Sequence, residues 1–180
     1  MDNGADNYRR YLDGDDGAFT AIVEEYRDGL IFFINRFVQD PATAEDIAID
    51  VFAELIVHPR RYDFRASLKT YLYTMGRSRA LNHLKHRRRF PEVELSESDA
   101  VSEEPESALL TDERRRVVSD AMDRLTPDKR TVLHLIYFED MSYEQAAQVM
   151  KKSVKQIDNL LYRAKSELRT IIGKDGIELL

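Results

Sequence analysis

Apolar residues recur at helical spacing along most of this 180-residue chain, and the strict alternation of a β-strand is nearly absent. The clearest example is a stripe in residues 16–38, which contains Phe19, Ile22, Val23, Tyr26, Leu30, Phe33, Ile34 and Phe37. Steps of three and four residues place these side chains on one helix face, which must be buried against other helices. The sequence therefore predicts an all-α fold.

Capping signals divide this pattern into separate helices. A short polar side chain before a helix accepts hydrogen bonds from the first backbone N–H groups, and proline fits the first helical position. The signals are Asp40-Pro41, Ser67, and the capping boxes Ser142-x-x-Gln145 and Ser153-x-x-Gln156. The predicted helices cover residues 7–12, 16–38, 41–57, 68–89, 107–124, 127–138, 143–150 and 154–172.

A change in composition divides the chain in two. Residues 91–106 are rich in Glu, Ser, Asp and Pro and carry no helical pattern, as expected of a solvated linker. The flanking segments are each long enough to form a small core. We therefore predict two helical bundles, 1–90 and 107–180, joined by the acidic linker 91–106.

Charge is distributed unevenly, which the net value of −6 hides. Residues 1–57 carry a net charge of −9, residues 58–90 carry +9, residues 91–113 carry −9, and residues 114–180 carry +3. Because charges more than about 8–10 Å apart are screened at physiological salt, a partner responds to the local field. The basic segment is therefore a candidate nucleic-acid surface.

The sequence argues against several other classes of protein. The chain has no cysteine, which excludes disulfides and zinc–thiolate sites and fits a reducing cytoplasm. The polar N-terminus predicts no signal peptide, and no apolar run approaches the ~18 residues of a membrane-spanning helix. Metalloprotease, phosphate-loop and nucleophile-elbow motifs are missing. We expect a cytoplasmic protein that is not an enzyme and needs no metal or cofactor.

The last two predicted helices are separated by only three residues, the spacing of a DNA-binding helix-turn-helix. Ile157 and Leu161 provide the buried stripe of the second helix. Its other face carries Lys155, Asp158, Asn159, Tyr162, Arg163 and Lys165. Asparagine pairs bidentately with adenine, and arginine with guanine, in the major groove. An ordinary helical hairpin with a solvated face would have the same spacing, so both interpretations stay open on this pattern alone.

The predicted helix 68–89 is strongly basic. Its core stripe is expected to contain Leu68, Leu72, Met75, Leu81 and Leu84. Four aromatic residues lie within it or in the preceding loop: Tyr62, Phe64, Tyr71 and Tyr73. Cations interleaved with rings suit opened nucleic acid, because the cations follow the backbone while the rings stack on exposed bases. The alternative is that the rings belong to the core and the terminal arginines offset the helix dipole.

The predicted helix 41–57 carries acidic residues on one face and apolar residues on another. Asp46, Asp50 and Glu54 follow i, i+4, i+8 spacing, and such like-charged neighbours cost a few tenths of a kcal/mol per pair. A basic partner surface would relieve this repulsion, whereas the simpler interpretation is a solvated face. The buried face is expected to contain Ile47, Val51, Phe52 and Leu55.

These segments together resemble the extracytoplasmic-function group of the sigma-70 family over nearly the whole chain. The most specific likeness is the segment AMDRLTPDKRTVLHLIYFEDMSYEQAAQVMKKSVKQIDNLLYRAKSELR, with its Leu-x-Pro, Tyr-Glu-Gln-Ala-Ala and Arg-Ala-Lys-x-x-Leu patterns. Family members consist of two helical domains, sigma region 2 and sigma region 4, joined by a variable linker. The resemblance assigns residues 19–89 to the first domain and 106–172 to the second.

The resemblance also implies partners and roles. Region 2 would dock on the clamp helices of the largest subunit of RNA polymerase, with further contact between the chain and the polymerase flap. The polymerase-binding residues would be Glu45, Asp46, Ile49, Asp50, Phe52 and Glu54. Residues that recognise and melt the −10 promoter element would be Tyr62, Phe64, Arg65, Lys69, Tyr71, Tyr73, Thr74, Arg77, Ser78, Arg79, Asn82 and Lys85. Residues on the −35 element would be Ser153, Lys155, Gln156, Asp158, Asn159, Tyr162, Arg163 and Lys165.

The implied function is that of a factor directing bacterial core polymerase to promoters, and an anti-sigma factor is an expected further partner. Two other hypotheses stay open. A free-standing regulator would bind a palindromic duplex tightly without polymerase. A helical interaction module would have no affinity for DNA, with or without polymerase.

Overall fold

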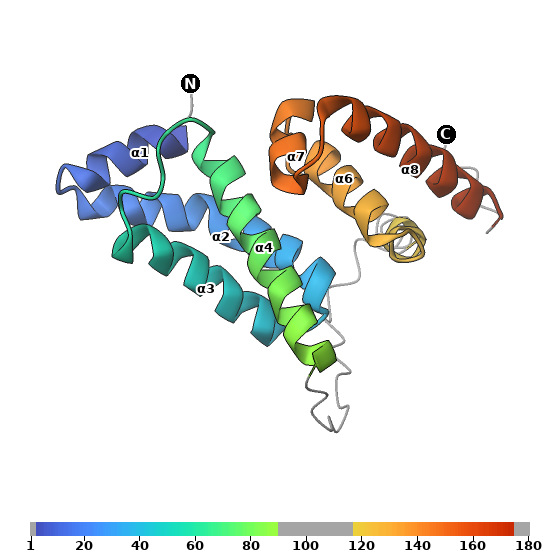
Figure 1. The fold of residues 1–180 in the computed structure, drawn as a ribbon, viewed down its shortest axis with the longest axis horizontal. Coiled ribbons are helices and arrows are strands. Elements are labelled where there is room, and N and C mark those ends of the chain that lie inside the picture. Colours follow the sequence, from blue (N-terminus) through green and yellow to red (C-terminus); the bar gives the residue numbers. More distant parts are fainter. Residues whose placement is uncertain (1–2, 90–116, 175–180) are drawn as a thin grey trace, which may run out of the picture.

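The computed structural model describes residues 3–89 and 117–174, and all regular structure in these ranges is helical (Figure 1). The first body consists of α1 (Asn3–Leu12), α2 (Asp16–Val38), α3 (Pro41–Val57) and α4 (Leu68–Arg89). The second consists of helical residues 117–123, α6 (Pro127–Tyr137), α7 (Tyr143–Met150) and α8 (Val154–Lys174). The all-α prediction is confirmed. No helix in the described ranges has the length and apolar character to span a membrane.

The predicted linker 91–106 and the first part of the predicted helix 107–124 lie outside the described residues. Elsewhere the helix boundaries agree with the sequence to within about two residues, except that α1 begins at Asn3 instead of near Asn7. Asn7 itself is buried. The polar residue at which this helix was expected to begin therefore lies within the helix and is buried.

Local hydrogen bonds explain where the helices begin. The backbone N–H of Thr43 donates to the Asp40 carboxylate at 3.1 Å, directly before Pro41. Gln145 N donates to Ser142 Oγ at 3.2 Å, and Ser142 N donates to Gln145 Oε1 at 2.8 Å, so this capping box is complete. The box predicted at the start of α8 is equally complete. These interactions satisfy N–H groups that have no partner within the helix.

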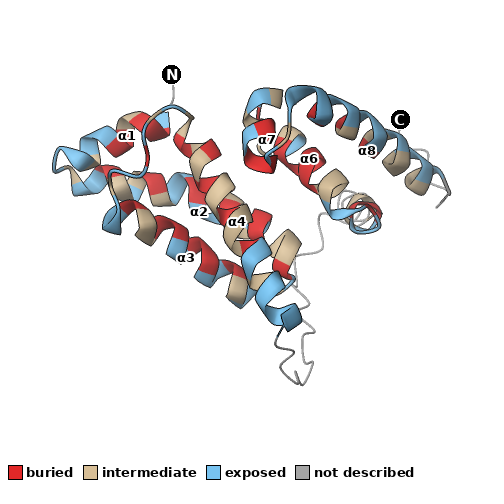
Figure 2. Cartoon of the chain, viewed as in Figure 1, coloured by how far each residue is buried: buried red, intermediate tan, exposed pale blue. Residues whose placement is uncertain are grey.

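The core of the first body lies between α2, α3 and α4 (Figure 2). Leu30 and Ile34 are fully buried, and a Cβ added to Gly76 of α4 would lie 3.0 Å from Leu30 Cδ1. The missing side chain therefore lets α4 approach α2 closely. The prediction for α4 was wrong at Leu81, which is 39% exposed, whereas Tyr73 takes a buried position at 1% exposure.

The second body has a compact core made by all its helices. It contains Val132, Leu135, Ala146, Ile157 and Leu161, each no more than 2% exposed. Lys151 ends α7 in the left-handed conformation (φ 54°), and its N–H bonds back to the helix. The chain then turns directly into α8, which is the helix-turn-helix arrangement predicted from the sequence.

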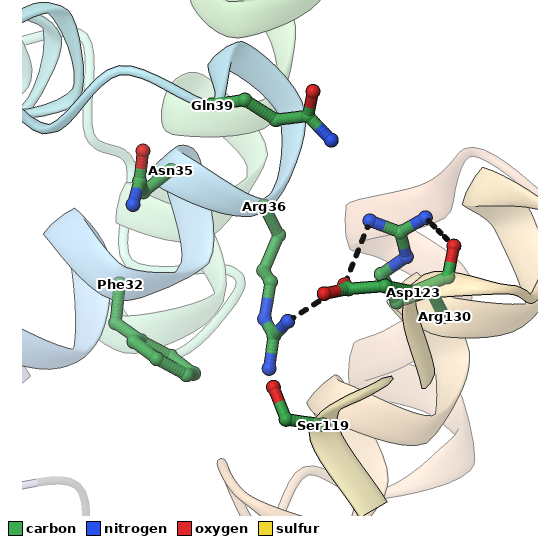
Figure 3. A pocket seen from close by; sticks show the side chains of 7 residues that line it. All are labelled: Phe32, Asn35, Arg36, Gln39, Ser119, Asp123 and Arg130. Carbon is green, nitrogen blue, oxygen red and sulfur yellow. Dashed lines mark hydrogen bonds and ion pairs between the residues drawn. The ribbon is translucent and has the colours of Figure 1, made fainter. Parts of the chain in front are cut away.

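The two bodies touch each other along one side of α4, where α7 packs against its first half (Figure 1). Gln145 Nε2 donates to Ser67 Oγ at 3.3 Å across this contact. Further along, the Arg36 guanidinium lies 3.0 Å from Asp123 Oδ1, and Arg130 contacts the same carboxylate at 3.3 Å (Figure 3). A hydrogen bond between neutral side chains thus joins the two bodies at one place, and an ion pair joins them at another.

Replacing Ser142 by alanine is expected to lower the free energy of unfolding by about 1 kcal/mol, because α7 loses the side-chain half of its capping box. Urea unfolding followed by circular dichroism measures this loss. The matched control is Ser166→Ala, at an exposed position inside α8. Equal unfolding curves for the two variants would contradict the role given to the cap.

Candidate nucleic-acid and polymerase interfaces

The reading face of α8 is open to solvent. Ile157, Leu161 and Ala164 are buried against the second body, and this fixes the rotation of the helix. The opposite side presents polar residues, with Tyr162 at 76% exposure. The exposed members of the predicted −35 set are Ser153, Lys155, Gln156, Asp158, Asn159, Tyr162 and Arg163. The helix can therefore enter a major groove without losing any contact to its own core.

Lys165 differs from the rest of the predicted −35 set. Its ammonium lies 5.3 Å from the centre of the Tyr137 ring, on the side of α8 that faces α6. A hydrogen bond with the Tyr137 side chain raises the pKa of Lys165. In this structure Lys165 belongs to the junction between α6 and α8 and is separate from the exposed reading face.

The predicted −10 residues divide into an exposed group and several groups with partners in the chain. Arg65, Asn82 and Lys85 are exposed at the two ends of the basic segment. Arg65 Nε lies 3.3 Å from Asp63, an exposed pair of the kind that contributes little to stability. These three side chains are accessible to a nucleic-acid backbone without rearrangement.

Three predicted aromatic residues form one cluster at the start of α4. The ring centre of Tyr62 lies 4.6 Å from that of Phe64 and 5.0 Å from that of Tyr71. Tyr62 is 2% exposed, and its hydroxyl donates to the Ala66 carbonyl at 2.8 Å. Phe64 has a left-handed backbone (φ 62°) and is half-buried, as is Tyr71. The buried ring of Tyr62 thus packs against the two more accessible rings.

Lys69 and Tyr73 lie against a carboxylate of the second body. The Lys69 ammonium lies 2.9 Å from Glu139 Oε2 and donates to the Glu139 carbonyl at 2.7 Å. Burial and a hydrogen bond with Glu139 raise the pKa of the Tyr73 hydroxyl. Burial alone would raise the pKa of Glu139, but hydrogen bonds from His134, Tyr73 and Lys69 lower it to about 2. The carboxylate is therefore ionised at neutral pH.

The remaining predicted residues of α4 are half-buried. Arg77 lies 3.8 Å from Asp128 of the second body, whereas Arg79 lies 3.0 Å from Glu54 of α3. The Thr74 hydroxyl donates to the carbonyl one turn earlier at 2.7 Å. Ser78 also belongs to this half-buried stretch. The middle of α4 is thus engaged within the protein, and its two ends are more accessible.

The acidic residues of α3 are partly neutralised from within the first body. Glu54 pairs with Arg61 and Arg79, and Asp50 lies 3.5 Å from Arg79. Glu45 pairs with an arginine of α2. Asp46 and Asp50 remain exposed. The repulsion expected along this row is therefore reduced by neighbouring arginines, and its exposed end still offers negative charge to a partner.

An apolar groove of about 240 Å³ runs between α2 and α3 beside this acidic row. Phe52 is 7% exposed and forms part of its lining, whereas Ile49 and Ile56 are 56% and 51% exposed. Exposed isoleucines along a groove with charged neighbours are typical of a protein-binding surface. Two of the predicted polymerase-binding residues, Ile49 and Phe52, therefore line the same groove.

A second apolar groove, of about 350 Å³, lies on the second body between residues 117–123, α6 and α8. Tyr137 and Phe138 are 51% and 55% exposed there. The residue-by-residue predictions did not include them, although two adjacent aromatic residues at the end of a helix are a usable sequence signal. Within the described ranges, no three His, Asp or Glu side chains gather as a possible metal site.

Each of the two bodies matches a family of known proteins. The model of Sigma-70 region 2 matches residues 22–90, and that of Sigma-70, region 4 matches residues 115–168. RNA polymerase sigma-H factor of Pseudomonas aeruginosa is 32% identical over 166 residues, which is 86% of each chain. The ECF RNA polymerase sigma-E factor of Haemophilus influenzae is 25% identical and covers 91% of this chain and 92% of its own length.

A solved structure has a similar fold. The sigma factor RpoE of Bartonella quintana, crystallised with the anti-sigma factor NepR, aligns with a TM-score of 0.67 at 20% identity, over 86% of this chain and 96% of the other. The two matched regions lie in the same order as the two helical bodies, and the relatives match along nearly their whole length. The chain therefore belongs to the sigma-70 family, in its extracytoplasmic-function group.

Proposed function

We propose that this chain directs core RNA polymerase to specific promoters and helps to open their DNA. The observation that carries the proposal is the pairing of two unlike surfaces: an exposed helix-turn-helix on one body, and a basic helix with clustered aromatic rings on the other. The first suits duplex DNA and the second suits opened strands. This role requires binding surfaces and no catalytic group of its own.

The upstream −35 element would be read by the exposed face of α8. Arg163 and Asn159 are suited to bidentate contacts with guanine and adenine. Lys155 and the positive N-terminal end of α8 would hold phosphates. This contact is expected to be weak alone, because residues 114–180 carry a net charge of only +3. Polymerase would hold this body, residues 107–180, at the upstream element.

The −10 element would be opened by the first body, residues 1–90. Arg65, Asn82 and Lys85 are placed to contact the strand backbone, and the half-buried rings of Phe64 and Tyr71 offer stacking surfaces. Extruding a base costs a few kcal/mol, and stacking offsets part of this cost. Lys69, Tyr73 and Arg77, also in the predicted −10 set, would contribute after their contacts to the second body are released.

Two polymerase contacts follow from the grooves. The groove between α2 and α3, with its acidic border, fits the clamp helices of the largest subunit. The exposed Tyr137 and Phe138 of the second groove fit the polymerase flap. We assign the chain to the bacterial cytoplasm, where polymerase acts. Because the Bartonella relative is bound by an anti-sigma factor, control by such an inhibitor is part of the proposal.

The test is transcription in vitro from fragmented genomic DNA with core polymerase of the source bacterium, with and without this chain, followed by mapping of RNA 5′ ends. New start sites that depend on the chain are expected, with shared sequences upstream. A free-standing regulator would bind its DNA without polymerase and create no new starts with core enzyme. Absence of new starts would reject the proposal.

Replacing Tyr71 by alanine is expected to weaken strand opening by about 1 kcal/mol, near the lower end for base–aromatic stacking because the ring is half-buried. Binding of the holoenzyme to closed duplex should change little. Permanganate reactivity of unpaired thymines measures opening, and gel mobility measures duplex binding. Tyr71→Phe is the matched control and should open DNA normally. Equal losses in both variants would point to the hydroxyl instead of the ring.

A further inference from the structure

Helix α1 lies beside the loop that precedes α4, although every residue assigned above to the −10 element follows it in the sequence, from Tyr62 onward. The helix packs against α2 and also contacts α4 (Figure 1). Its fit on α2 is close, because a Cβ added to Gly4 would lie 2.5 Å from the Tyr26 hydroxyl. The helix is therefore an integral part of the first body.

Tyr8 connects α1 to the loop between α3 and α4. Its side chain is fully buried, and its hydroxyl donates to the Leu55 carbonyl at 2.8 Å. Leu55 lies in the last turn of α3, where the carbonyl groups have no partner within the helix. The same hydroxyl also lies 3.3 Å from the Pro59 carbonyl, in the loop itself. One buried side chain therefore fixes where the loop leaves α3.

The ring of Tyr8 packs against the aromatic cluster at the start of α4. Its centre lies 5.6 Å from that of the Tyr62 ring and 6.0 Å from that of the Phe64 ring. Phe64 has a left-handed backbone, which costs free energy for a bulky residue and persists only where the surrounding structure imposes it. The contact with α1 is part of that surrounding structure. Tyr8 is therefore placed to hold the Phe64 ring in its position.

Arg9, the next residue of α1, lies over the Phe64 ring. Its guanidinium carbon is 4.7 Å from the centre of that ring, and its side chain is 55% exposed. Within α1 the guanidinium pairs with Asp6 at 2.6 Å, an exposed ion pair of the kind that contributes little to stability. A DNA phosphate can therefore replace Asp6 as the partner of Arg9 at little cost in free energy.

The position of Arg9 suits a single strand of nucleic acid. Such strands bind where cations follow the backbone while aromatic rings stack on the bases. Phe64 is one of the two half-buried rings that offer a stacking surface, and Arg9 places a cation directly at it. A guanidinium also forms bidentate hydrogen bonds with phosphate. Arg9 is thus suited to bind the phosphate of a nucleotide whose base stacks on this cluster.

We propose that α1 is part of the surface that binds the opened −10 strand: Arg9 contacts a phosphate of that strand, and Tyr8 positions Phe64 for stacking. The inference rests on the function proposed above and extends it to a helix that precedes every residue assigned to the −10 element. A purely structural role for α1 would account for the burial of Tyr8, but the charge of Arg9 would then have no effect on DNA binding. This difference decides the test.

The first test replaces Arg9 by glutamine, which removes the charge at an exposed position. Holoenzyme made from the full chain and core polymerase is titrated against a labelled single strand that carries the −10 element of a promoter found by start-site mapping. Fluorescence anisotropy gives the affinity at several salt concentrations. Binding is expected to weaken about fivefold at 0.1 M salt, because the loss of one phosphate contact reduces the slope of log K against log salt by about 0.7.

Arg10→Gln is the matched control, because it removes the same charge from the neighbouring exposed residue, which pairs with Asp15. It should leave the affinity and the slope as in the wild type. Arg9→Lys keeps the charge and should keep the wild-type slope. An unchanged slope in Arg9→Gln, or an equal change in Arg10→Gln, would overturn the phosphate contact. A wild-type holoenzyme that does not bind the strand would instead reject the proposed function.

The second test addresses the positioning role of Tyr8. Tyr8→Phe keeps the ring and removes the hydroxyl that donates to the Leu55 carbonyl. Strand binding is expected to weaken about threefold, a coupling near the lower end for residues in contact, with no change in the salt slope. In a Phe64→Ala background the same substitution should have no effect, since the ring to be positioned is gone. Tyr11→Phe, at a half-buried ring of the same helix, is the control and should bind as the wild type does. Equal losses from Tyr8→Phe with and without the Phe64 ring would overturn the positioning role.

Discussion

Replacing Ile49 by aspartate is expected to weaken binding of the chain to core RNA polymerase by about 3 kcal/mol, on the order of a hundredfold. Ile49 is 56% exposed and lies on the border of the groove between α2 and α3. An aspartate there would become a desolvated, unpaired charge when a polymerase helix covers the groove. The fold of the free chain should be unaffected, since the side chain already faces solvent.

The matched control for this prediction is Leu12→Asp. Leu12 is 44% exposed at the end of α1 and does not line the groove. Titration of labelled chain with purified core polymerase gives both affinities. Equal affinities for the two variants would contradict the docking surface, and a loss in Leu12→Asp alone would move it to α1.

Arg163→Ala is expected to weaken holoenzyme binding to promoters with an intact −35 element by up to about 3 kcal/mol, a factor of about 150. Arg163 is exposed on the reading face of α8, where its guanidinium can donate two hydrogen bonds to the acceptor atoms of a guanine. The same substitution should matter little on a promoter whose −35 sequence is scrambled. This difference separates base reading from general attraction to phosphate.

Arg163→Lys sharpens this prediction because it keeps the positive charge and removes the planar fork. If Arg163 reads a base, lysine should restore little of the lost affinity. If it contacts only phosphate, lysine should restore most of it, and the scrambled promoter should lose as much as the intact one. The second pattern would contradict the assignment of Arg163 as a base-reading residue.

Structural features that depend only on residues close together in the sequence were predictable. The Ser142 and Ser153 capping boxes and the Asp40-Pro41 helix start need only three or four adjacent residues to form, and all were confirmed. The core stripe of α2 was predictable for the same reason. Its long helix has one clearly apolar face, so Leu30 and Ile34 could be assigned to the core from spacing alone.

Helix α4 was harder to predict because it is covered on more than one side. It packs against α2 and α3 of its own body and against α7 of the other. Its apolar residues therefore do not form one stripe, and Leu81 is exposed while Tyr73 is buried. A single helical period cannot describe a helix that packs against several others, particularly when one of them follows more than fifty residues later.

The interface around Glu139 could not be predicted from the sequence. Glu139 lies in a short turn after α6, where an acidic residue is ordinary, and His134 resembles any isolated histidine. Their importance comes from Lys69 and Tyr73, about 70 residues earlier in the chain. Such a contact depends on how the two bodies are arranged, and neither the composition nor the periodicity of the sequence indicates this arrangement.

The most direct test of the central claim is a footprint on one promoter identified by start-site mapping. The claim is that two weak DNA-binding bodies hold separate promoter elements only when polymerase sets their spacing. Three samples are compared: the chain alone, core polymerase alone, and both together. We predict that only the mixture protects two stretches, one at each element. Equal protection by the chain alone, or none by the mixture, would contradict the claim.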